Sequence, residues 1–402
     1  MAMNNEFEII VRVHEVALKG KNRPVFIKAL VTNLKRATQN MGIADVITEH
    51  LLIRIKLEAG ADWDLIRKAI SRVPGAVKFS LVRSVAADFD EIASAVNSLV
   101  KDSKFDTFRV TAHRADKRFE WSSREMNVSL GALVEHTSGA TVDLKNPQLN
   151  IHVDVLSKNA FVWAGDEEGM GGLPTGTGGK VAVLMSGGID SPVAAWRMIK
   201  RGCEASLIHF HSFPLVEGRS REKAMDLASR LNDFQLKTSL HLVPFAALQQ
   251  EIILSVPGPL RVVIYRRFML RIAEKIAKMN NASALVTGES LGQVGSQTLR
   301  NMSTVGEVAS QTILRPLIGM DKSEIIQQAQ TIGTFPISIL PDEDCCTLFV
   351  PKSPSTKVSN QEARIAEIEL DIDRLVDDAI KKSETFEYRL NEKPIQVNKS
   401  ES

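Results

Sequence analysis

Ser186-Gly187-Gly188-Ile189-Asp190-Ser191 follows the apolar run Val181 to Met185 and precedes a helical stretch from Pro192 to Lys200. This order predicts a strand, a tight turn and a helix. The two glycines let the backbone approach an anion, and the first N–H groups of the helix point at it. The lysine of a GxxxxGK[ST] loop is absent. A turn that needs glycine for geometry alone is the alternative, but the whole hexapeptide in this setting favours nucleotide binding.

Strands and helices alternate from Lys180 onward, which predicts a doubly wound parallel sheet with its ligand at the carboxyl ends of the strands. Ser186 and Gly288 follow two of these strands, and His209-Phe210 ends a third, so all three are expected at one edge. The predicted strands are Val181–Met185, Glu204–His209, Thr238–Pro244 and Ala284–Thr287, and the predicted helices are 191–201, 219–232, 259–279 and 321–332.

The first half of the chain predicts two smaller units. The predicted order is a strand at Phe7–Val13, a helix at Arg23–Met41, a strand at Leu51–Leu57, a helix at Trp63–Ile70 and a strand at Val77–Val82. With one middle strand left unassigned, this order is like the β-α-β-β-α-β order typical of a ferredoxin-like α+β unit. A second α/β unit has helices at Asp90–Val100 and Ser123–His136 and strands at Thr107–His113, Ile151–Leu156 and Ala160–Trp163.

The predicted domain ranges are 1–60, 61–165 and 180–402, with a linker at 166–179, although the ferredoxin-like order of elements continues to near residue 80. Gly165 to Gly179 is rich in glycine and reads either as a flexible linker or as a segment that folds over bound phosphates. The tail from Gln361 to Ser383 reads as one acidic amphipathic helix. Its expected inward residues are Ile365, Ile368, Ile372, Leu375 and Ala379.

Length and composition describe a globular protein of two or three domains. The chain has 402 residues, of which 44% are hydrophobic and 24% charged, with a net charge of +2. No apolar run is long enough to span a membrane and no signal peptide precedes the first strand, so a cytoplasmic protein is expected. Residues 12–36 hold seven Lys/Arg and one acid, which is either a polyanion-binding surface or a solvated face.

Several further motifs occur in a fixed order. Arg12 to Arg23 resembles the opening of the tRNA 4-thiouridine synthetase (ThiI) family, although Val13-His14 replaces the usual Tyr-Gly. Phe108–Phe119 and Val142–Pro147 resemble a THUMP domain, which is an RNA-binding module. Gly171 to Ala194 is similar to the linker and PP-loop of that family, and Leu340 to Lys352 to its cysteine loop. The chain stops without a rhodanese domain, so it resembles the short form of the family.

The resemblance implies an enzyme that adenylates uridine 8 of tRNA with ATP and Mg²⁺ and replaces O4 with sulfur. It implies catalytic roles for Asp190, Cys345 and Lys322, although Asp190 could cap the next helix and a lone lysine is often solvated. The implied ATP-binding residues are Leu184, Met185, Ser186, Gly187, Gly188, Asp190, Ser191, His209, Phe210, Arg266, Gly288 and Gln297. His209 could equally be a satisfied histidine at the sheet end.

The resemblance implies that Cys345 carries the sulfur as a persulfide, because family members with a single cysteine keep it directly after the acidic pair, which is Glu343-Asp344 here. Cys346 is expected to be a buried small residue. Cys203 is either a resolving thiol or a packed core cysteine. Adjacent cysteines span a cluster poorly and the CxxC spacing is missing, so an iron–sulfur cluster is not expected, and no PLP or haem site is recognised.

The remaining expectations concern partners. Lys19, Lys21, Arg23, Arg114, Lys117 and Arg118 are expected to bind the tRNA backbone. The resemblance implies a cysteine desulfurase as sulfur donor, a homodimer, and sulfur transfer to the ThiS carrier for thiamine as a weaker branch. Two alternatives remain: another PP-loop ligase that acts on a small molecule, and a tRNA chaperone with a decayed site. Pyrophosphate release that depends on tRNA would separate them.

Overall fold

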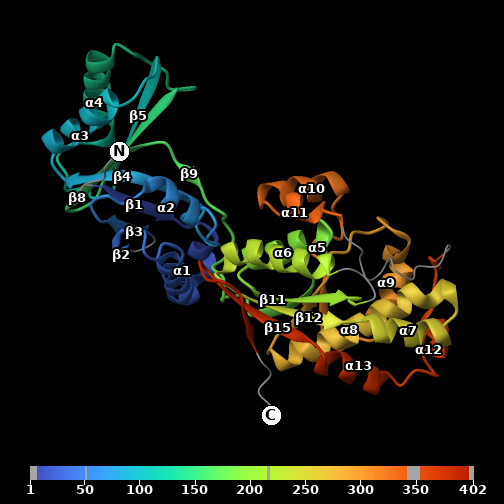
Figure 1. The fold of residues 1–402 in the computed structure, drawn as a ribbon. Helices are drawn as coiled ribbons and strands as arrows, with labels where there is room; N and C mark the ends of the chain where they lie inside the picture. Colours follow the sequence, from blue (N-terminus) through green and yellow to red (C-terminus); the bar gives the residue numbers. More distant parts are fainter. Residues whose placement is uncertain (1–6, 50–51, 215–217, 342–353, 398–402) are drawn as a thin grey trace. The chain divides into compact units, whose positions relative to one another are not determined.

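The computed structural model describes residues 7–49, 52–214, 218–341 and 354–397. They form two compact units, Met1–Gly172 and Leu173–Ser402, and each unit has its own sheet (Figure 1).

The first part of the N-terminal unit has the ferredoxin-like order that the sequence predicts. Its central strand β1 pairs antiparallel with β3 on one side and with β4 on the other. Helix α2 begins after Asp62, whose side chain accepts hydrogen bonds from the N–H groups of Asp64 and Leu65. The elements are β1 (Phe7–Arg12), η1 (Glu15–Asn22), α1 (Arg23–Ala37), β2 (Ile43–Glu49), β3 (Leu52–Leu57), α2 (Trp63–Ile70) and β4 (Lys78–Ala86).

The second part of this unit continues the same sheet. Strand β8 pairs with β4, and the strand order is β2-β3-β1-β4-β8-β7-β5-β6, with β9 also beside β4. Helices α3 and α4 pack on this half through buried residues such as Ile92, Val96, Met126 and Leu130. The elements are α3 (Phe89–Lys101), β5 (Thr107–Arg114), α4 (Ser123–Ser138), β6 (Thr141–Val142), β7 (Leu149–Val155), β8 (Asn159–Ala164) and β9 (Glu167–Glu168).

The C-terminal unit is built on a doubly wound sheet, as predicted. The strand order is β14-β13-β10-β11-β12-β15-β16, and the strands from β14 to β12 are parallel. The chain therefore starts at β10, moves outward to β11 and β12, and then returns to the other side of β10 for β13. This reversal at the carboxyl end of β10 is where doubly wound folds bind their ligands.

Helices cover both faces of this sheet (Figure 1). Helices α5 and α6 lie on one face, while α8 and α13 lie on the other, where Ile208 and Phe210 of β11 pack with Phe268 of α8. The central elements are β10 (Lys180–Leu184), α5 (Asp190–Lys200), β11 (Glu204–His211), α6 (Arg219–Gln235), β12 (Lys237–Pro244), α7 (Ala246–Ser255), η2 (Gly258–Leu260), α8 (Arg261–Met279) and β13 (Ala284–Val286). The later ones are η3 (Gly295–Gln297), α9 (Leu299–Gly306), β14 (Thr312–Leu314), α10 (Lys322–Thr331), α11 (Phe335–Ser338), α12 (Asn360–Ala366), α13 (Ile372–Lys381), β15 (Glu384–Arg389) and β16 (Ile395–Val397).

The prediction of one helix over Gln361–Ser383 is wrong. The segment forms two helices, α12 and α13, and Ile365 and Ile368 are exposed rather than inward. The break occurs at Glu367, whose buried carboxylate accepts hydrogen bonds from Arg267 and Arg271 of α8. Beyond α13, the unpredicted strand β15 pairs antiparallel with β12.

The glycine-rich linker does not fold over residues 186–191, hereafter the phosphate loop. Gly176 N and Gly178 N both donate to Gly202 O, and Leu173 N donates to Lys200 O, so residues 173–178 lie at the amino end of β11. A Cβ atom on Gly178 would lie 2.9 Å from Arg201 O, which explains why glycine is needed there. The phosphate loop lies at the opposite edge of the sheet, at the carboxyl end of β10.

Candidate active site

The phosphate loop connects β10 to α5 as predicted, and two serines hold its shape. Ser186 N donates to Ser191 Oγ at 2.9 Å, the two hydroxyl oxygens lie 3.0 Å apart, and Gly188 N donates to Ser186 Oγ at 3.3 Å. Ser191 is buried in the first turn of α5. These hydrogen bonds therefore join the two ends of the loop, next to the first turn of α5.

Gly288 brings the end of β13 against the start of this helix. A Cβ atom at position 288 would lie 2.8 Å from both Cα and N of Ser191. These are backbone atoms, so a larger residue would displace α5 or the loop. The position requires glycine for this close approach.

Asp190 and Lys322 meet at the mouth of the loop. Lys322 Nζ donates to Asp190 Oδ1 at 2.6 Å, and Gln293 Nε2 donates to Asp190 Oδ2 at 3.0 Å. The carboxylate does not cap α5: the N-cap residue is Ile189, and the described part of the chain shows no side-chain capping hydrogen bond there. This observation counts against the capping alternative for Asp190.

The position of Lys322 follows from local structure around α10. Asp321 and Glu324 form a capping box that starts this helix at Lys322. Before the helix, Leu291 N donates to Ile318 O and Ser290 Oγ donates to Met320 O. These bonds join the segment after β13 to the segment after β14. This arrangement places Lys322 beside Asp190 of the phosphate loop.

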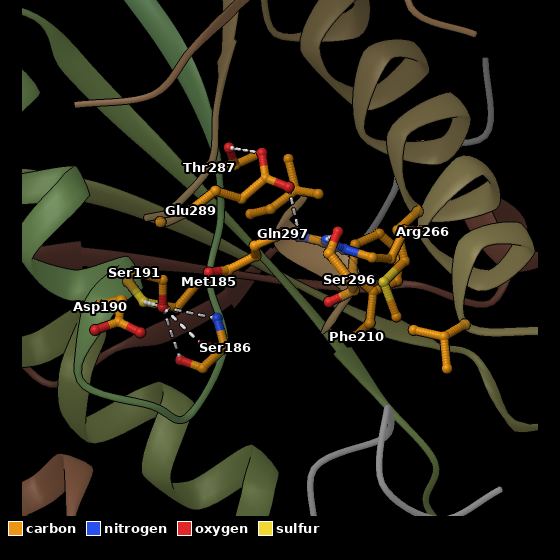
Figure 2. Close-up of a pocket in the computed structure, with 14 residues that line it drawn as sticks. Met185, Ser186, Asp190, Ser191, Phe210, Arg266, Thr287, Glu289, Ser296 and Gln297 are labelled. Atoms are coloured by element: carbon orange, nitrogen blue, oxygen red, sulfur yellow. Dashed lines mark hydrogen bonds and ion pairs between the residues drawn. The ribbon is translucent and has the colours of Figure 1, made fainter. Parts of the chain in front are cut away.

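A cavity of about 260 Å³, hereafter the phosphate-loop pocket, opens beside these residues (Figure 2). Nine of the twelve ATP-binding residues implied by the resemblance line it, and Val262, Met269, Thr287, Glu289 and Ser296 complete its wall. The nine are Leu184, Met185, Ser186, Asp190, Ser191, Phe210, Arg266, Gly288 and Gln297. The structure thus brings together residues that are more than 100 positions apart in the sequence.

His209, Gly187 and Gly188 are not in that wall. His209 is buried, and its Nδ1 lies 2.9 Å from Met185 O while its Nε2 lies 2.7 Å from Ser220 Oγ. Its ring therefore links the residue before the phosphate loop to α6. His209 therefore fits the alternative of a histidine at the end of the sheet with both ring nitrogens hydrogen-bonded. It supports the phosphate loop without lining the pocket.

Sequence reasoning missed the pocket residues outside the motifs. Val262 and Met269 share one face of α8 with Arg266, at the spacing i, i+4, i+7, so helical periodicity could have found them. Glu289 lies beside Gly288, but its partners Arg266 and Arg315 come from distant segments, at 2.6 Å and 2.7 Å. Burial favours a raised pKa for Glu289, but the two arginines and Thr287 hold this pKa below its ordinary value.

Cys345 and Cys346 lie outside the described residues. Described residues near both ends of 342–353 form hydrogen bonds within the C-terminal unit, and one of these reaches the phosphate loop. Lys223 Nζ of α6 donates to Leu340 O at 2.7 Å, and Ser338 Oγ donates to Gly188 O of the phosphate loop at 3.3 Å. On the other side, Asn301 Nδ2 donates to Ser355 O at 2.9 Å.

Cys203 has the features of a packed core cysteine. It is buried, its Sγ lies 3.4 Å from Gly178 O, and burial raises the pKa of its thiol although Arg201 acts to lower it. It precedes β11 and so lies at the edge of the sheet opposite the phosphate loop. This placement favours the packed-core alternative over a resolving thiol.

The residues expected to bind tRNA fall into two groups within the N-terminal unit. Lys19 and Lys21 lie in η1 and Arg23 begins α1; Arg23 is held by a hydrogen bond to Ala17 O, while Lys21 is exposed. Arg114 and Arg118 flank a turn after β5 with the exposed Lys117 between them.

Two arginines of the second group have intramolecular partners. Arg114 Nη1 donates to Phe119 O at 3.0 Å, and the guanidinium of Arg118 pairs with Asp116 at 2.7 Å. The hydrogen bonds from Arg118 lower the pKa of Asp116 to about 2. Arg118 would therefore have to leave this carboxylate in order to contact a phosphate.

Two kinds of feature are absent from the described part of the chain. None of its helices combines the length and apolarity needed to cross a bilayer. No group of three His, Cys, Asp or Glu side chains in that part is placed to hold a metal ion.

Comparison with known proteins gives matches along most of the chain. The profile of the family "Thiamine biosynthesis protein (ThiI)" matches residues 176–372, that of the ThiI ferredoxin-like domain 8–80, and that of the THUMP domain 86–163. A probable tRNA sulfurtransferase from Thermus thermophilus is 45% identical over 384 residues, which are 95% of this chain and 94% of the relative.

Solved structures agree with these matches. A crystal structure of a 4-thiouridine synthetase–RNA complex with bound ATP is 36% identical, with a TM-score of 0.89 over 95% of this chain and 100% of that one. The protein PH1313 from Pyrococcus horikoshii shares the fold, with a TM-score of 0.62 at 19% identity over 81% of this chain and 99% of its own. The chain belongs to the ThiI family of tRNA sulfurtransferases.

Proposed function

We propose that this protein is a tRNA uracil 4-sulfurtransferase, which uses ATP to replace O4 of uridine 8 with sulfur. The observation that carries the proposal is the Asp190–Lys322 pair at the mouth of a phosphate loop, at the switch point of a doubly wound sheet. The similarity over 95% of the chain to a probable tRNA sulfurtransferase supports the same substrate class.

The pocket suits ATP at both of its ends. The phosphate loop provides N–H groups and a helix N-terminus for anionic oxygens. The opposite end offers the apolar side chains of Phe210, Val262 and Met269 to a base. Gln297 Oε1 is buried there without a hydrogen-bond partner among the described residues, so an acceptor is available for a donor of the nucleotide.

The residues of this site suit Mg²⁺ only when nucleotide phosphates provide additional ligands to the ion. Asp190 offers a carboxylate, the oxygen ligand that Mg²⁺ prefers, and nucleotide phosphates would provide the further ligands. Such an ion would neutralise phosphate charge while the adenylyl group is transferred. Lys322 is placed to add a positive charge beside the same oxygens once the nucleotide separates it from Asp190.

Adenylation makes the uridine oxygen easy to displace. In the proposed reaction O4 attacks the α-phosphate of ATP and pyrophosphate leaves, held by the phosphate loop. The terminal sulfur of a Cys345 persulfide then attacks C4, and AMP departs with the former O4. A second thiol reduces the resulting disulfide and releases 4-thiouridine. An external thiol is the better candidate for this step, because Cys203 is buried at the other edge of the sheet.

The N-terminal unit is proposed to bind the tRNA. The related 4-thiouridine synthetase was crystallised with RNA, and the THUMP match covers residues 86–163. Lys19 and Lys21 are proposed as phosphate contacts together with Lys117, because lysine side chains neutralise phosphates without reading the sequence. Arg23, Arg114 and Arg118 are retained as weaker candidates, because each donates to an intramolecular acceptor.

The other partners follow from the same proposal. A cysteine desulfurase is proposed as sulfur donor, with a homodimer as assembly, the cytoplasm as location and ThiS as a second sulfur acceptor. We place the first domain boundary between residues 80 and 86, where the two matched profiles meet, rather than at 60. The pairing of β4 with β1 supports this placement.

Pyrophosphate release tests the proposal. The wild-type protein should release pyrophosphate from ATP only when unmodified tRNA is present. Asp190→Asn should abolish release and leave tRNA affinity unchanged. Asp377→Asn is the matched control, because Asp377 also pairs with a lysine, Lys275, but lines no part of the pocket. Equal release with and without tRNA, or full release by Asp190→Asn, would contradict the proposed function.

A further inference from the structure

Glu289 is buried in the wall of the phosphate-loop pocket between two arginines. Its Oε1 accepts a hydrogen bond from Arg266 Nη2 at 2.6 Å, and its Oε2 accepts one from Arg315 Nε at 2.7 Å. Thr287 Oγ1 donates to the same Oε2 at 2.8 Å. The Glu289 side chain is only 4% exposed, so its position is fixed from several sides.

These contacts fix the guanidinium of Arg266. Besides its bond to Glu289, Arg266 Nη1 donates to Ser296 O at 3.1 Å. A guanidinium has five N–H donors in one plane, so two bonds determine the orientation of the whole group. Arg266 lines the pocket, and its remaining donors are available to a bound molecule.

Arg266 and the phosphate loop occupy different ends of the pocket. In Figure 2, Arg266, Phe210 and Ser296 lie together on one side, while Ser186, Asp190 and Ser191 lie on the other. Phosphates belong at the loop, so the Arg266 end faces the nucleoside. A contact made there is common to ATP and AMP.

We propose that Glu289 is a positioning residue, which holds Arg266 in the orientation that binds the nucleoside part of ATP. Arg315 and Thr287 in turn hold Glu289. This inference rests on the proposed function, because that function makes ATP the occupant of the pocket.

A Glu289→Gln variant distinguishes a role of Glu289 in orienting Arg266 from a purely electrostatic effect of its charge on the bound nucleotide. The substitution removes one negative charge between two arginines, so attraction alone would tighten binding, and it would tighten ATP more than AMP because ATP carries more charge. Loss of positioning instead weakens both nucleotides by the same factor. The two explanations therefore predict opposite signs.

The chain offers a closely matched control. Glu367 is also 4% exposed, and its carboxylate accepts hydrogen bonds from Arg267 and Arg271 at 2.7 to 2.9 Å. It does not line the phosphate-loop pocket. Glu367→Gln therefore removes a buried charge of the same kind and reports the purely structural cost.

The experiment measures ATP and AMP affinity of the full chain by calorimetry, together with the KM for ATP, tRNA affinity and the melting temperature. Glu289→Gln is expected to weaken both nucleotides about tenfold, as loss of a charge-assisted hydrogen bond does, with unchanged tRNA affinity. Glu367→Gln is expected to lower the melting temperature and leave both affinities unchanged. Arg315→Gln, which loosens Glu289 without lining the pocket, should weaken both nucleotides equally but less; it also serves if Glu289→Gln does not fold.

Two results would overturn the inference while the proposed function stands. One is a Glu289→Gln variant that binds both nucleotides like the wild type. The other is a variant in which ATP binds more tightly, or in which only one nucleotide is affected. If the wild-type protein binds neither nucleotide, the proposed function itself fails and the role of Glu289 falls with it.

Discussion

Lys322 Nζ lies 2.6 Å from Asp190 Oδ1, although the two residues are 132 positions apart in the sequence. The pair combines the one acid of the phosphate loop with the lysine that begins α10. Each side chain thus keeps the other at the mouth of the pocket, where phosphates are proposed to bind.

Replacement of Lys322 by alanine should impair adenylation far more than folding. The side chain is 43% exposed, so its removal changes stability little, whereas a charge beside transferred phosphates typically contributes on the order of a hundredfold in rate. The measurement is kcat/KM for tRNA-dependent pyrophosphate release. Lys275→Ala removes a lysine from a comparable surface ion pair and should have no effect. Equal rates for the two variants would exclude a role for Lys322.

The close approach at Gly288 gives a steric prediction. A methyl group there would lie 2.8 Å from backbone atoms of Ser191, so Gly288→Ala should displace the phosphate loop and cost about 1–3 kcal/mol of stability. ATP affinity should fall with it. Gly319→Ala is the control, because a Cβ atom there meets nothing within 4 Å. Binding by Gly288→Ala at the wild-type level would show that the loop tolerates the methyl group.

The sequence predicts those parts of this site that are formed by residues close together in the chain, and it does not predict contacts between distant segments. The strand–turn–helix at 180–200 is local, so the hexapeptide and its flanking patterns were enough to place it. The face of α8 that carries Arg266 is also encoded locally, by helical spacing. The pairing of Glu289 with Arg315 is not, because it depends on β13 and β14 lying side by side.

The structure of the segment from Gln361 to Ser383 also depends on contacts with residues far away in the sequence. Its apolar spacing is compatible with one long helix, and nothing local indicates a break at Glu367. The break becomes intelligible only once Arg267 and Arg271 of α8 are placed beside that carboxylate. Strand β15 likewise has its partner β12 about 150 residues earlier, which a local pattern does not reveal.

The buried His211 is expected to make the stability of the C-terminal unit dependent on pH. Burial, with smaller contributions from Arg221 and His209, lowers the pKa of His211 to about 3. The unfolded chain binds this proton near pH 6.5, so between pH 6.5 and 3 the unfolded state holds more protons than the folded state. Stability should therefore fall with decreasing pH, by up to about 1.4 kcal/mol per unit from this group. His211→Gln should reduce that slope in urea titrations at pH 7.5 and pH 5. An unchanged slope would show that His211 is not the group responsible.

The basic segment near the N-terminus predicts salt-dependent tRNA binding. Charge reversal at Lys19 and Lys21 should weaken binding and reduce the slope of log affinity against log salt by about 2, since each phosphate contact contributes nearly one unit. The same charge change at Lys381 and Lys382, which are exposed at the end of α13 in the C-terminal unit, is the control for net charge. Equal effects of the two double variants would mean that only overall charge matters.

The most direct test of the account is nucleoside analysis of tRNA by mass spectrometry after incubation with the protein, ATP, Mg²⁺ and a persulfide donor. The account predicts 4-thiouridine at position 8, formed only when ATP is present. Cys345→Ser should still release pyrophosphate but make no thionucleoside, because serine cannot carry a persulfide, while Cys346→Ser should keep at least one turnover. Absence of 4-thiouridine with wild-type protein that binds ATP and tRNA, or its formation without ATP, would contradict the account.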